Sequence, residues 1–151
     1  MEGGSEIRES ISRILSAGIP VCGHVGLTPQ SVNKFGGYGV RAKSDAEAEK
    51  LIADARMLDE MGCFAIVLEK IPAALAARVT REVSCPVIGI GAGAEVDGQI
   101  LVVQDMLGMN RGFAPKFMRR YGSFGDEIQA AVAHYVDDVK AVDFPNASEQ
   151  Y

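Results

Sequence analysis

The stretch from Phe64 to Lys70 constrains the fold more than any other part of this sequence. Five consecutive apolar residues, Phe64 to Leu68, end abruptly at Glu69, and a glycine and a proline flank the stretch. A short apolar run between such residues is typical of a strand buried on both faces of a parallel sheet. A carboxylate at the C-terminal end of such a strand lies where parallel α/β proteins place their chemistry. Glu69 is therefore a candidate for proton transfer, unless it is a solvated residue beside Lys70.

Two other apolar segments, Pro20 to Val25 and Pro86 to Ile90, also predict strands. Apolar residues at helical spacing predict helices around and between the strands, and Ser5 and Ser44 are the expected N-caps of two of them. These helices run from Ser5 to Ala17, from the Ser44 capping box to Gly62, from Pro72 through Val83, and onward from Asp126. The alternation is typical of repeated βα units with a parallel sheet.

Two segments have no clear periodicity. Residues 26–43 are rich in Gly, Asn, Ser and Lys, and long structured loops of this kind tend to bind ligands or cover sites. Residues 97–108 fit either a strand or a short buried helix. A strand parallel to the preceding one needs a crossover of about a dozen residues or more, and Ala94 to Gln99 is too short for that. We therefore expect a helix within 97–108.

The composition argues against several classes of partner. Twenty acidic and fifteen basic residues give a formal charge of −5 in a chain of 151 residues. Lys and Arg do not cluster, so we expect neither a nucleic-acid partner nor a membrane partner. No apolar run approaches the ~20 residues of a membrane helix, and the N-terminus does not resemble a signal peptide. The three cysteines lie in or beside apolar runs, which predicts reduced, buried thiols and a cytoplasmic location.

Three strand ends, at His24, Glu69 and Gly89 to Gly93, would lie in one mouth of a βα barrel. His24 could bind a substrate oxygen or transfer a proton, with a structural histidine as an equal alternative. Cys22 and His24 alone supply too few ligands for a metal site. The glycine stretch partly matches a dinucleotide fingerprint but lacks its third glycine and the following acid, so close packing is the better interpretation. Glu2-Gly3-Gly4 lies directly before a helix, which is where the end of a strand lies in a βα unit. The segment is either an ordinary terminus or the end of a strand whose upstream part is outside this sequence.

Five ungapped blocks, taken together, are far more specific than any short motif. They are Pro20 to Ser31, Phe35 to Tyr38, Val67 to Glu69, Pro86 to Gly93 and Asp97 to Val102. In these blocks the sequence closely resembles the ketopantoate hydroxymethyltransferase family, and the resemblance runs over nearly the whole chain.

The resemblance implies an α/β fold of the (βα)8 TIM-barrel class and an enzyme of pantothenate biosynthesis. Such an enzyme removes a C3 proton from 3-methyl-2-oxobutanoate, and the enolate takes a hydroxymethyl group from 5,10-methylenetetrahydrofolate to give ketopantoate. A Mg²⁺ ion holds the 2-oxo acid and stabilises the developing charge. By position in the family's motifs, Glu69 corresponds to the general base and Glu2 to a residue of the metal site. His24 corresponds to a position at the rim of the active site, where it would contact the substrate.

The resemblance also implies that the chain covers roughly the second half of the barrel. Residues 1–142 would form the C-terminal half with its C-terminal helix, and residues 143–151 a loose tail, whereas a whole barrel takes about 250 residues. The family's two metal-binding aspartates and its substrate-binding lysine lie upstream and have no counterpart here. Half a barrel leaves sheet edges and apolar surface unpaired, so we expect a homo-oligomer or association with a missing half-barrel.

Three functional hypotheses remain open from the sequence. The chain is part of an active hydroxymethyltransferase, or it is a truncated, non-catalytic half-barrel that binds or regulates a full-length relative. The third hypothesis is a 2-oxo acid lyase on a related barrel. The block around His24 argues against a lyase, and folate dependence of turnover would distinguish the two enzymes. The expected location is cytoplasmic, with a mitochondrial alternative if an upstream targeting segment belongs to the protein.

Overall fold

A computed structural model describes residues 1–110, 112 and 114–151 of the chain. Contacts within the chain divide it into unit 1, Met1–Ile100, and unit 2, Leu101–Tyr151, and each unit is described by itself. The expected half-barrel domain over residues 1–142, with a tail over 143–151, stays a prediction.

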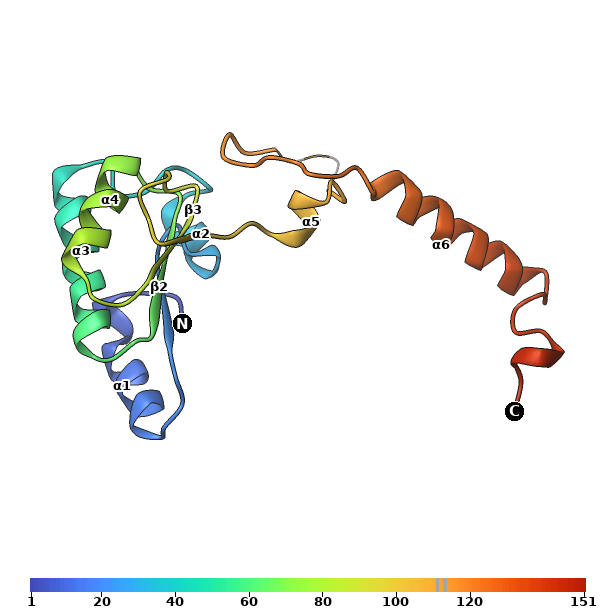
Figure 1. Cartoon of the computed structure of the whole chain (residues 1–151), viewed down its shortest axis with the longest axis horizontal. Helices are drawn as coiled ribbons and strands as arrows, with labels where there is room; N and C mark the ends of the chain where they lie inside the picture. The colour runs from blue at the N-terminus through green and yellow to red at the C-terminus, as the bar shows by residue number, and fades with distance from the viewer. Residues whose placement is uncertain (111, 113) are drawn as a thin grey trace. The chain divides into compact units, whose positions relative to one another are not determined.

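Unit 1 alternates helices and strands in the expected order (Figure 1). Its elements are η1 (Ser5–Ile7), α1 (Arg8–Ser16), β1 (Cys22–Gly26), η2 (Pro29–Ser31), α2 (Val32–Phe35), α3 (Asp45–Glu60), β2 (Ala65–Glu69), α4 (Ala73–Glu82), β3 (Val87–Ile90) and β4 (Gly98–Gln99). Unit 2 contains α5 (Val103–Met106), α6 (Gly125–Lys140) and η3 (Ala147–Glu149). Within the described residues, no helix is long and apolar enough to cross a membrane.

The strands form one sheet in the order β1-β2-β3-β4, and every pair is parallel. The predicted parallel βα construction is therefore confirmed. The register pairs Gly26 with Glu69 and Leu68 with Gly89. The strand ends at Gly26, Glu69 and Ile90 consequently lie at the same edge of the sheet, which is where parallel α/β proteins carry their functional groups.

The expected helix within residues 97–108 is present, but the exclusion of a strand from this segment is wrong. Gly98 and Gln99 form β4, parallel to β3, and the helix is confined to α5. Asp97 makes this possible without a long crossover, because its amide donates to the Val87 carbonyl (3.0 Å) and its carboxylate accepts the Val87 amide (2.8 Å). The chain crosses directly through residues 91–97, and this short connection serves a strand of only 2 residues.

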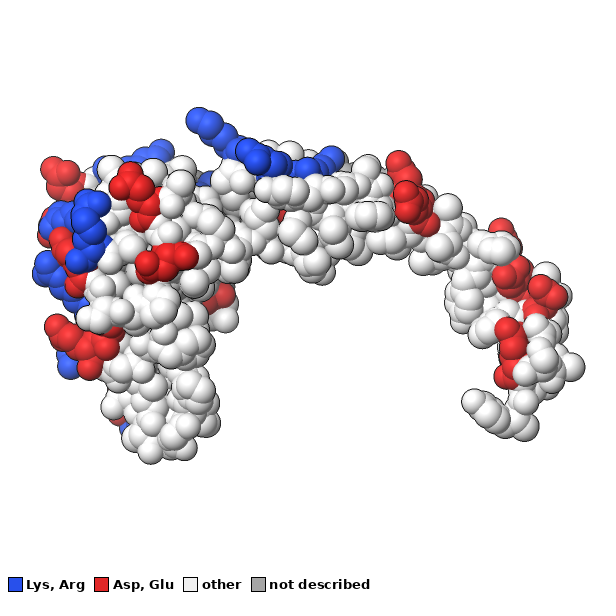
Figure 2. Space-filling model, viewed as in Figure 1, with Lys and Arg blue, Asp and Glu red and all other residues white. Residues whose placement is uncertain are grey.

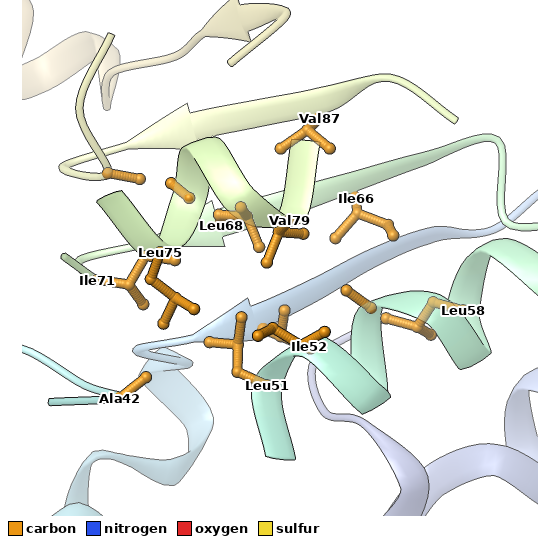
Figure 3. Close-up of a cluster of buried hydrophobic side chains, with 14 of the residues drawn as sticks. Ala42, Leu51, Ile52, Leu58, Ile66, Leu68, Ile71, Leu75, Val79 and Val87 are labelled. Atoms are coloured by element: carbon orange, nitrogen blue, oxygen red, sulfur yellow. The ribbon is translucent and has the colours of Figure 1, made fainter. Parts of the chain in front are cut away.

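A hydrophobic core lies between the sheet and helices α3 and α4 (Figure 3). Strand side chains alternate between the two faces, and those that point toward the helices include Ile66, Leu68 and Val87. Val25 of β1 belongs to the same buried cluster. These side chains pack against Leu51, Ile52 and Leu58 of α3 and Leu75 and Val79 of α4. Burial of this apolar surface is the main stabilising contribution to unit 1.

The expectation that the run from Phe64 is buried on both faces is wrong. Phe64 precedes β2 and is 58% exposed, and Val67 is only partly buried. The described residues cover the two faces unequally, because the core lies on the face of Ile66 and Leu68. Cys22, His24, Val67, Glu69 and Ile88 are partly exposed, and their positions in the strands alternate with the core positions.

Two expected helix starts differ in detail from the structure. Ser44 caps α3, since its Oγ accepts the Glu47 amide at 3.3 Å, but the Glu47 carboxylate binds Arg41 instead of closing the capping box. Ser5 does not cap a helix: it begins η1, and α1 starts at Arg8. The Ser5 amide instead donates to Asp54 of α3 at 3.0 Å.

Charges of both signs are interspersed on the helices of unit 1 (Figure 2). Arg56 of α3 lies 2.7 Å from Glu82 of α4, and Arg78 of α4 lies 2.7 Å from Glu49 of α3. Exposed ion pairs of this kind contribute little to stability. The two helices are held together mainly by the core beneath them.

In unit 2, α6 carries its apolar residues on one side, as predicted, and starts one residue before the expected Asp126. These residues are all exposed in the structure: Ile128, Val132, Tyr135, Val136 and Val139. None of the residues of α6 is buried. The amphipathic helix therefore presents an apolar stripe that its own unit does not cover.

The cysteines are free thiols, as expected for reduced residues, but burial is correct for Cys63 alone, since Cys22 and Cys85 are partly exposed. Burial is the main cause that raises the pKa of Cys85 to about 12, and the neighbouring Asp59 adds to the shift. Asp59 itself accepts the amides of Ser84 (2.8 Å) and Cys85 (2.9 Å), so the end of α3 anchors the turn into β3. The Ser84 amide is the main cause that lowers the pKa of Asp59.

We expect the Cys85 thiol to make the chain less stable at alkaline pH. An unfolded thiol has a pKa of about 8.5, whereas that of folded Cys85 is raised to about 12. The folded state binds this proton more tightly, so the stabilising contribution is complete below pH ~8.5 and is lost as pH rises through ~12. The free energy of urea unfolding should fall more steeply across this range in the native chain than in Cys85→Ala. Parallel pH dependences in the two proteins would contradict the assignment.

Candidate functional site

The N-terminal segment extends the sheet beyond β1. Glu2 forms an isolated parallel bridge with His24, and the Gly3 amide donates to the His24 carbonyl at 3.0 Å. Glu2 therefore occupies the position of a strand end beside β1, as the pattern Glu2-Gly3-Gly4 suggested. The three residues singled out from the sequence, Glu2, His24 and Glu69, lie on three adjacent extended segments.

The register brings the three side chains together on one face of the sheet. Gly26 pairs with Glu69, and His24 lies two positions earlier on β1, so the side chains of His24 and Glu69 point to the same side. His24 Nε2 is 3.1 Å from Glu69 Oε2, and His24 Nδ1 is 3.9 Å from Glu2 Oε1. The imidazole thus lies between two carboxylates. The side chains of Glu2, His24 and Glu69 are 21%, 17% and 16% exposed, which excludes a fully solvated Glu69.

His24 Nε2 is a buried polar atom without a hydrogen-bond partner among the described residues. Glu69 Oε2 lies 3.1 Å from it, but the two atoms do not form a hydrogen bond. A buried polar group without a partner is unfavourable by about 1–3 kcal/mol. An acceptor oxygen of a bound molecule at this position would relieve that cost.

The other carboxylate, Glu2, is oriented by the loop that follows β1. Its Oε2 accepts the Gln30 amide at 3.0 Å, which ties η2 to the site. Sequence reasoning did not identify Gln30, because a backbone donor leaves no signature in residue type. The Glu2 oxygen nearer to His24 is Oε1.

The main chain on both sides of the Glu69 carboxylate is tightly fixed. A Cβ at Gly26 would lie 2.3 Å from the Glu69 carbonyl oxygen, and Gly26 has φ +98°. The same carbonyl accepts the Leu27 amide at 2.8 Å, and the Lys70 amide donates to Ile90 at 2.8 Å. Lys70 itself has φ +50°, an uncommon conformation for a residue with a side chain. Both neighbouring strands therefore hold the turn that aims Glu69.

The glycine stretch after β3 is closely packed. A Cβ at Gly93 would lie 2.5 Å from the Cβ of Ala73, the first residue of α4, and one at Gly89 would lie 3.0 Å from Val96. Close contact between backbone and side chains accounts for these glycines without a bound nucleotide. The geometry therefore supports close packing, which is the interpretation of these glycines preferred from the sequence.

The described residues do not form a metal site by themselves. No group of three or more His, Cys, Asp or Glu side chains among them is arranged to hold an ion. Mg²⁺ prefers oxygen ligands and is commonly bound through one or two carboxylates, with water and substrate oxygens completing its coordination. Glu2 fits the role of one such carboxylate.

A cavity of about 280 Å³ lies in unit 1. Glycines of the N-terminal turn, the end of β1 and charged residues of α3, including Asp54, form its walls. Neither His24 nor Glu69 is among its lining residues. The two carboxylates and the histidine therefore lie on the open face of the sheet, outside this cavity.

A parallel sheet with helices on one face, and with acidic and histidine side chains gathered at the carboxyl edge of its strands, is the arrangement of α/β-barrel proteins of the TIM-barrel type. A family model described as ketopantoate hydroxymethyltransferase matches residues 1–147. The chain belongs to this family, which confirms the family and fold class expected from the sequence.

Curated relatives agree with the family match. A protein of Parabacteroides distasonis and one of Porphyromonas gingivalis are each 66% identical over 151 residues, and one of Flavobacterium johnsoniae is 64% identical. All three are named 3-methyl-2-oxobutanoate hydroxymethyltransferase. The matches cover 100% of this chain and 55%, 55% and 56% of the relatives. The chain thus spans about half the length of the curated relatives it matches.

We expect Gly26→Ala to destabilise the chain more than Gly36→Ala. Both glycines have positive φ, so each substitution carries a strain of about 1–2 kcal/mol. Only at position 26 would the new Cβ also collide with the Glu69 carbonyl, since nothing lies within 4 Å of a Cβ at Gly36. Urea unfolding of the two variants measures the difference. Equal losses would show that the close approach at Gly26 is not a packing constraint.

Proposed function

We propose that this chain contributes the general base and one metal ligand to a 3-methyl-2-oxobutanoate hydroxymethyltransferase. The reaction transfers a hydroxymethyl group from 5,10-methylenetetrahydrofolate to 3-methyl-2-oxobutanoate and gives ketopantoate. The observation that carries the proposal is the cluster of Glu69, His24 and Glu2 at the carboxyl edge of the sheet. The names of the relatives supply the reaction class.

Glu69 is the proposed base. Its carboxylate is 16% exposed and ends a strand beside the His24 ring, so it can face a bound molecule with little competition from water. It accepts the C3 proton of the 2-oxo acid, and the electrons of the C–H bond pass into an enolate. A positioned base typically contributes a factor of about 10²–10⁴ to the rate of such a step.

His24 and Glu2 are proposed to hold the substrate in place. The Nε2 atom of His24 has no hydrogen-bond partner among the described residues, so it is suited to a carboxylate or keto oxygen of the 2-oxo acid. Glu2 is the residue of this chain proposed as a ligand of Mg²⁺. When bound, the ion would stabilise negative charge on the keto oxygen.

The remaining chemistry joins C3 of the enolate to the one-carbon unit. A new C–C bond forms, both bonds between that carbon and the two folate nitrogens break, and water provides the hydroxyl group. The two nitrogens take up the proton removed from C3 and the remaining proton of the water. Tetrahydrofolate is released, and no change in oxidation state of the protein is needed. Ketopantoate formation should therefore require the folate donor, and turnover of the 2-oxo acid without it would instead support a lyase.

We expect Glu69→Gln to slow C3 proton exchange of 3-methyl-2-oxobutanoate in D₂O by about 10²–10⁴-fold, because the amide cannot accept the proton. The measurement is proton NMR of the 2-oxo acid with the active assembly that contains this chain. Glu95→Gln is the matched control, since the Glu95 side chain is 80% exposed and lies 3.8 Å from Arg81. Undiminished exchange in Glu69→Gln would remove Glu69 from the role of base.

We also propose that the chain works in association, either as a homo-oligomer or with segments that complete the barrel. The face of the sheet that carries His24 and Val67 is partly exposed, and the apolar stripe of α6 is exposed in unit 2. Large apolar surfaces of this kind usually mark contacts with other protein surfaces.

We also propose a cytoplasmic location. The curated relatives named above are bacterial, so they lend no support to a mitochondrial alternative.

Native mass spectrometry tests the association. A particle of this chain alone has a mass of 16.1 kDa. We expect a larger mass under native conditions, because burial of the exposed apolar surface favours assembly. A stable monomer of 16.1 kDa that still forms ketopantoate would contradict the proposed association.

A further inference from the structure

A buried carboxylate outside the cluster of Glu2, His24 and Glu69 has no role in the proposed chemistry. Asp54 of α3 is 7% exposed, and charged side chains are seldom buried unless they are paired. Its Oδ1 accepts the Ser5 amide at 3.0 Å, and its Oδ2 accepts from Lys50 Nζ. Asp54 thus connects the middle of α3 to the turn that follows Glu2.

The turn is built directly against this carboxylate. A Cβ at Gly4 would lie 2.1 Å from Asp54 Cγ, so a side chain at this position would require the Asp54 carboxylate to move. Only glycine allows the backbone to approach so closely. Gly4 and Asp54 therefore form one close contact, in which the hydrogen-bonded Asp54 carboxylate fixes the position of the Gly4 backbone.

The link between this contact and Glu2 is short, and Glu2 itself also accepts the Gln30 amide at 3.0 Å. Gly3 has φ +127°, and two consecutive glycines restrict the chain direction less than any other pair. Upstream, the segment is held by an isolated bridge to β1. The cavity of about 280 Å³ lies beside Gly3, Gly4 and Asp54, so on that side the turn is not supported by packed atoms.

We propose that Asp54 is a positioning residue for Glu2. By accepting the Ser5 amide and packing on Gly4, it holds the Glu2 carboxylate beside His24. The catalytic meaning of this inference rests on the proposed function, because Glu2 is there the metal ligand. The structural part, that Asp54 fixes the Glu2 segment, can be tested without any turnover.

Lys50 balances the charge of Asp54. Burial works to lower the pKa of Lys50, but the hydrogen bond and charge of Asp54, together with the charge of Glu6, outweigh it and raise the pKa. Lys50 Nζ also lies 3.4 Å from Glu6, and its side chain is 58% exposed. If Asp54 were neutral, the ammonium could remain with Glu6 and water. Replacing the charge therefore need not disrupt the fold.

Two substitutions separate the hydrogen bond from the charge. Asp54→Asn and Asp54→Leu have similar size and both remove the partner of Lys50, but only Asn retains an acceptor for the Ser5 amide. Positioning through Ser5 predicts that the Leu variant loosens the Glu2 segment and the Asn variant does not. Similar thermal midpoints for the two variants establish that both are folded.

Hydrogen exchange of single amides in the full chain is the direct measurement. The Gly3 amide reports the contact with β1, and the Gln30 amide reports the position of Glu2 Oε2. In Asp54→Leu both should exchange about fivefold faster, because one hydrogen bond of roughly 1 kcal/mol is lost. The Lys70 amide, bonded to Ile90, is the control and should not change. Equal rates in the Asn and Leu variants would overturn the proposal.

A double-mutant cycle then tests the consequence for catalysis. In the active assembly, Asp54→Leu should lower kcat for ketopantoate formation about tenfold in the native background. It should have no further effect once Glu2→Gln is present, because residues that act through one another are not additive. An undiminished effect of Asp54→Leu in the Glu2→Gln background would contradict positioning through Glu2. If Glu2→Gln itself left kcat unchanged, the proposed metal role of Glu2 would fall, and the exchange rates would still decide the structural inference.

Discussion

The parallel pairing of β1 with β2 is the constraint on which the candidate site depends. Its register sets Gly26 opposite Glu69 and thereby brings His24 within 3.1 Å of the Glu69 carboxylate. A shift of one residue would turn one of these side chains to the opposite face of the sheet. The core on the other face prevents such a shift, since Val25, Ile66 and Leu68 would lose their contacts with α3 and α4. Packing on one face thus determines the geometry of chemistry on the other.

Residue patterns predicted the helices, the three main strands and the parallel sheet, because apolar periodicity reports the face that each element buries. They failed where a particular tertiary contact decided the outcome. Asp97 provides both a donor and an acceptor to Val87, and so allows a strand to follow β3 without a helix. Phe64 looked like part of a buried run, but the strand begins one residue later and leaves it 58% exposed.

The candidate site was predictable in part. Glu69 was identified as a carboxylate at the end of an apolar strand, and the family motifs pointed to His24 and Glu2. Their mutual distances were not predictable, because they follow from the register and from the bridge between Glu2 and His24. The supporting contacts were also hidden, since Gln30 acts through its backbone and Asp54 reads in the sequence as an ordinary helix residue.

The isolated bridge of Glu2 gives the site an uneven mechanical character. His24 and Glu69 belong to paired strands that rest on a continuous core, whereas Glu2 contacts the sheet through an isolated bridge. Segments of this kind open locally at a lower free energy than the core of the same domain. Warming or mild denaturant would therefore separate the Glu2 carboxylate from the other two groups while the sheet stays intact. This chain would then lose the cluster of Glu2, His24 and Glu69 before it lost its fold.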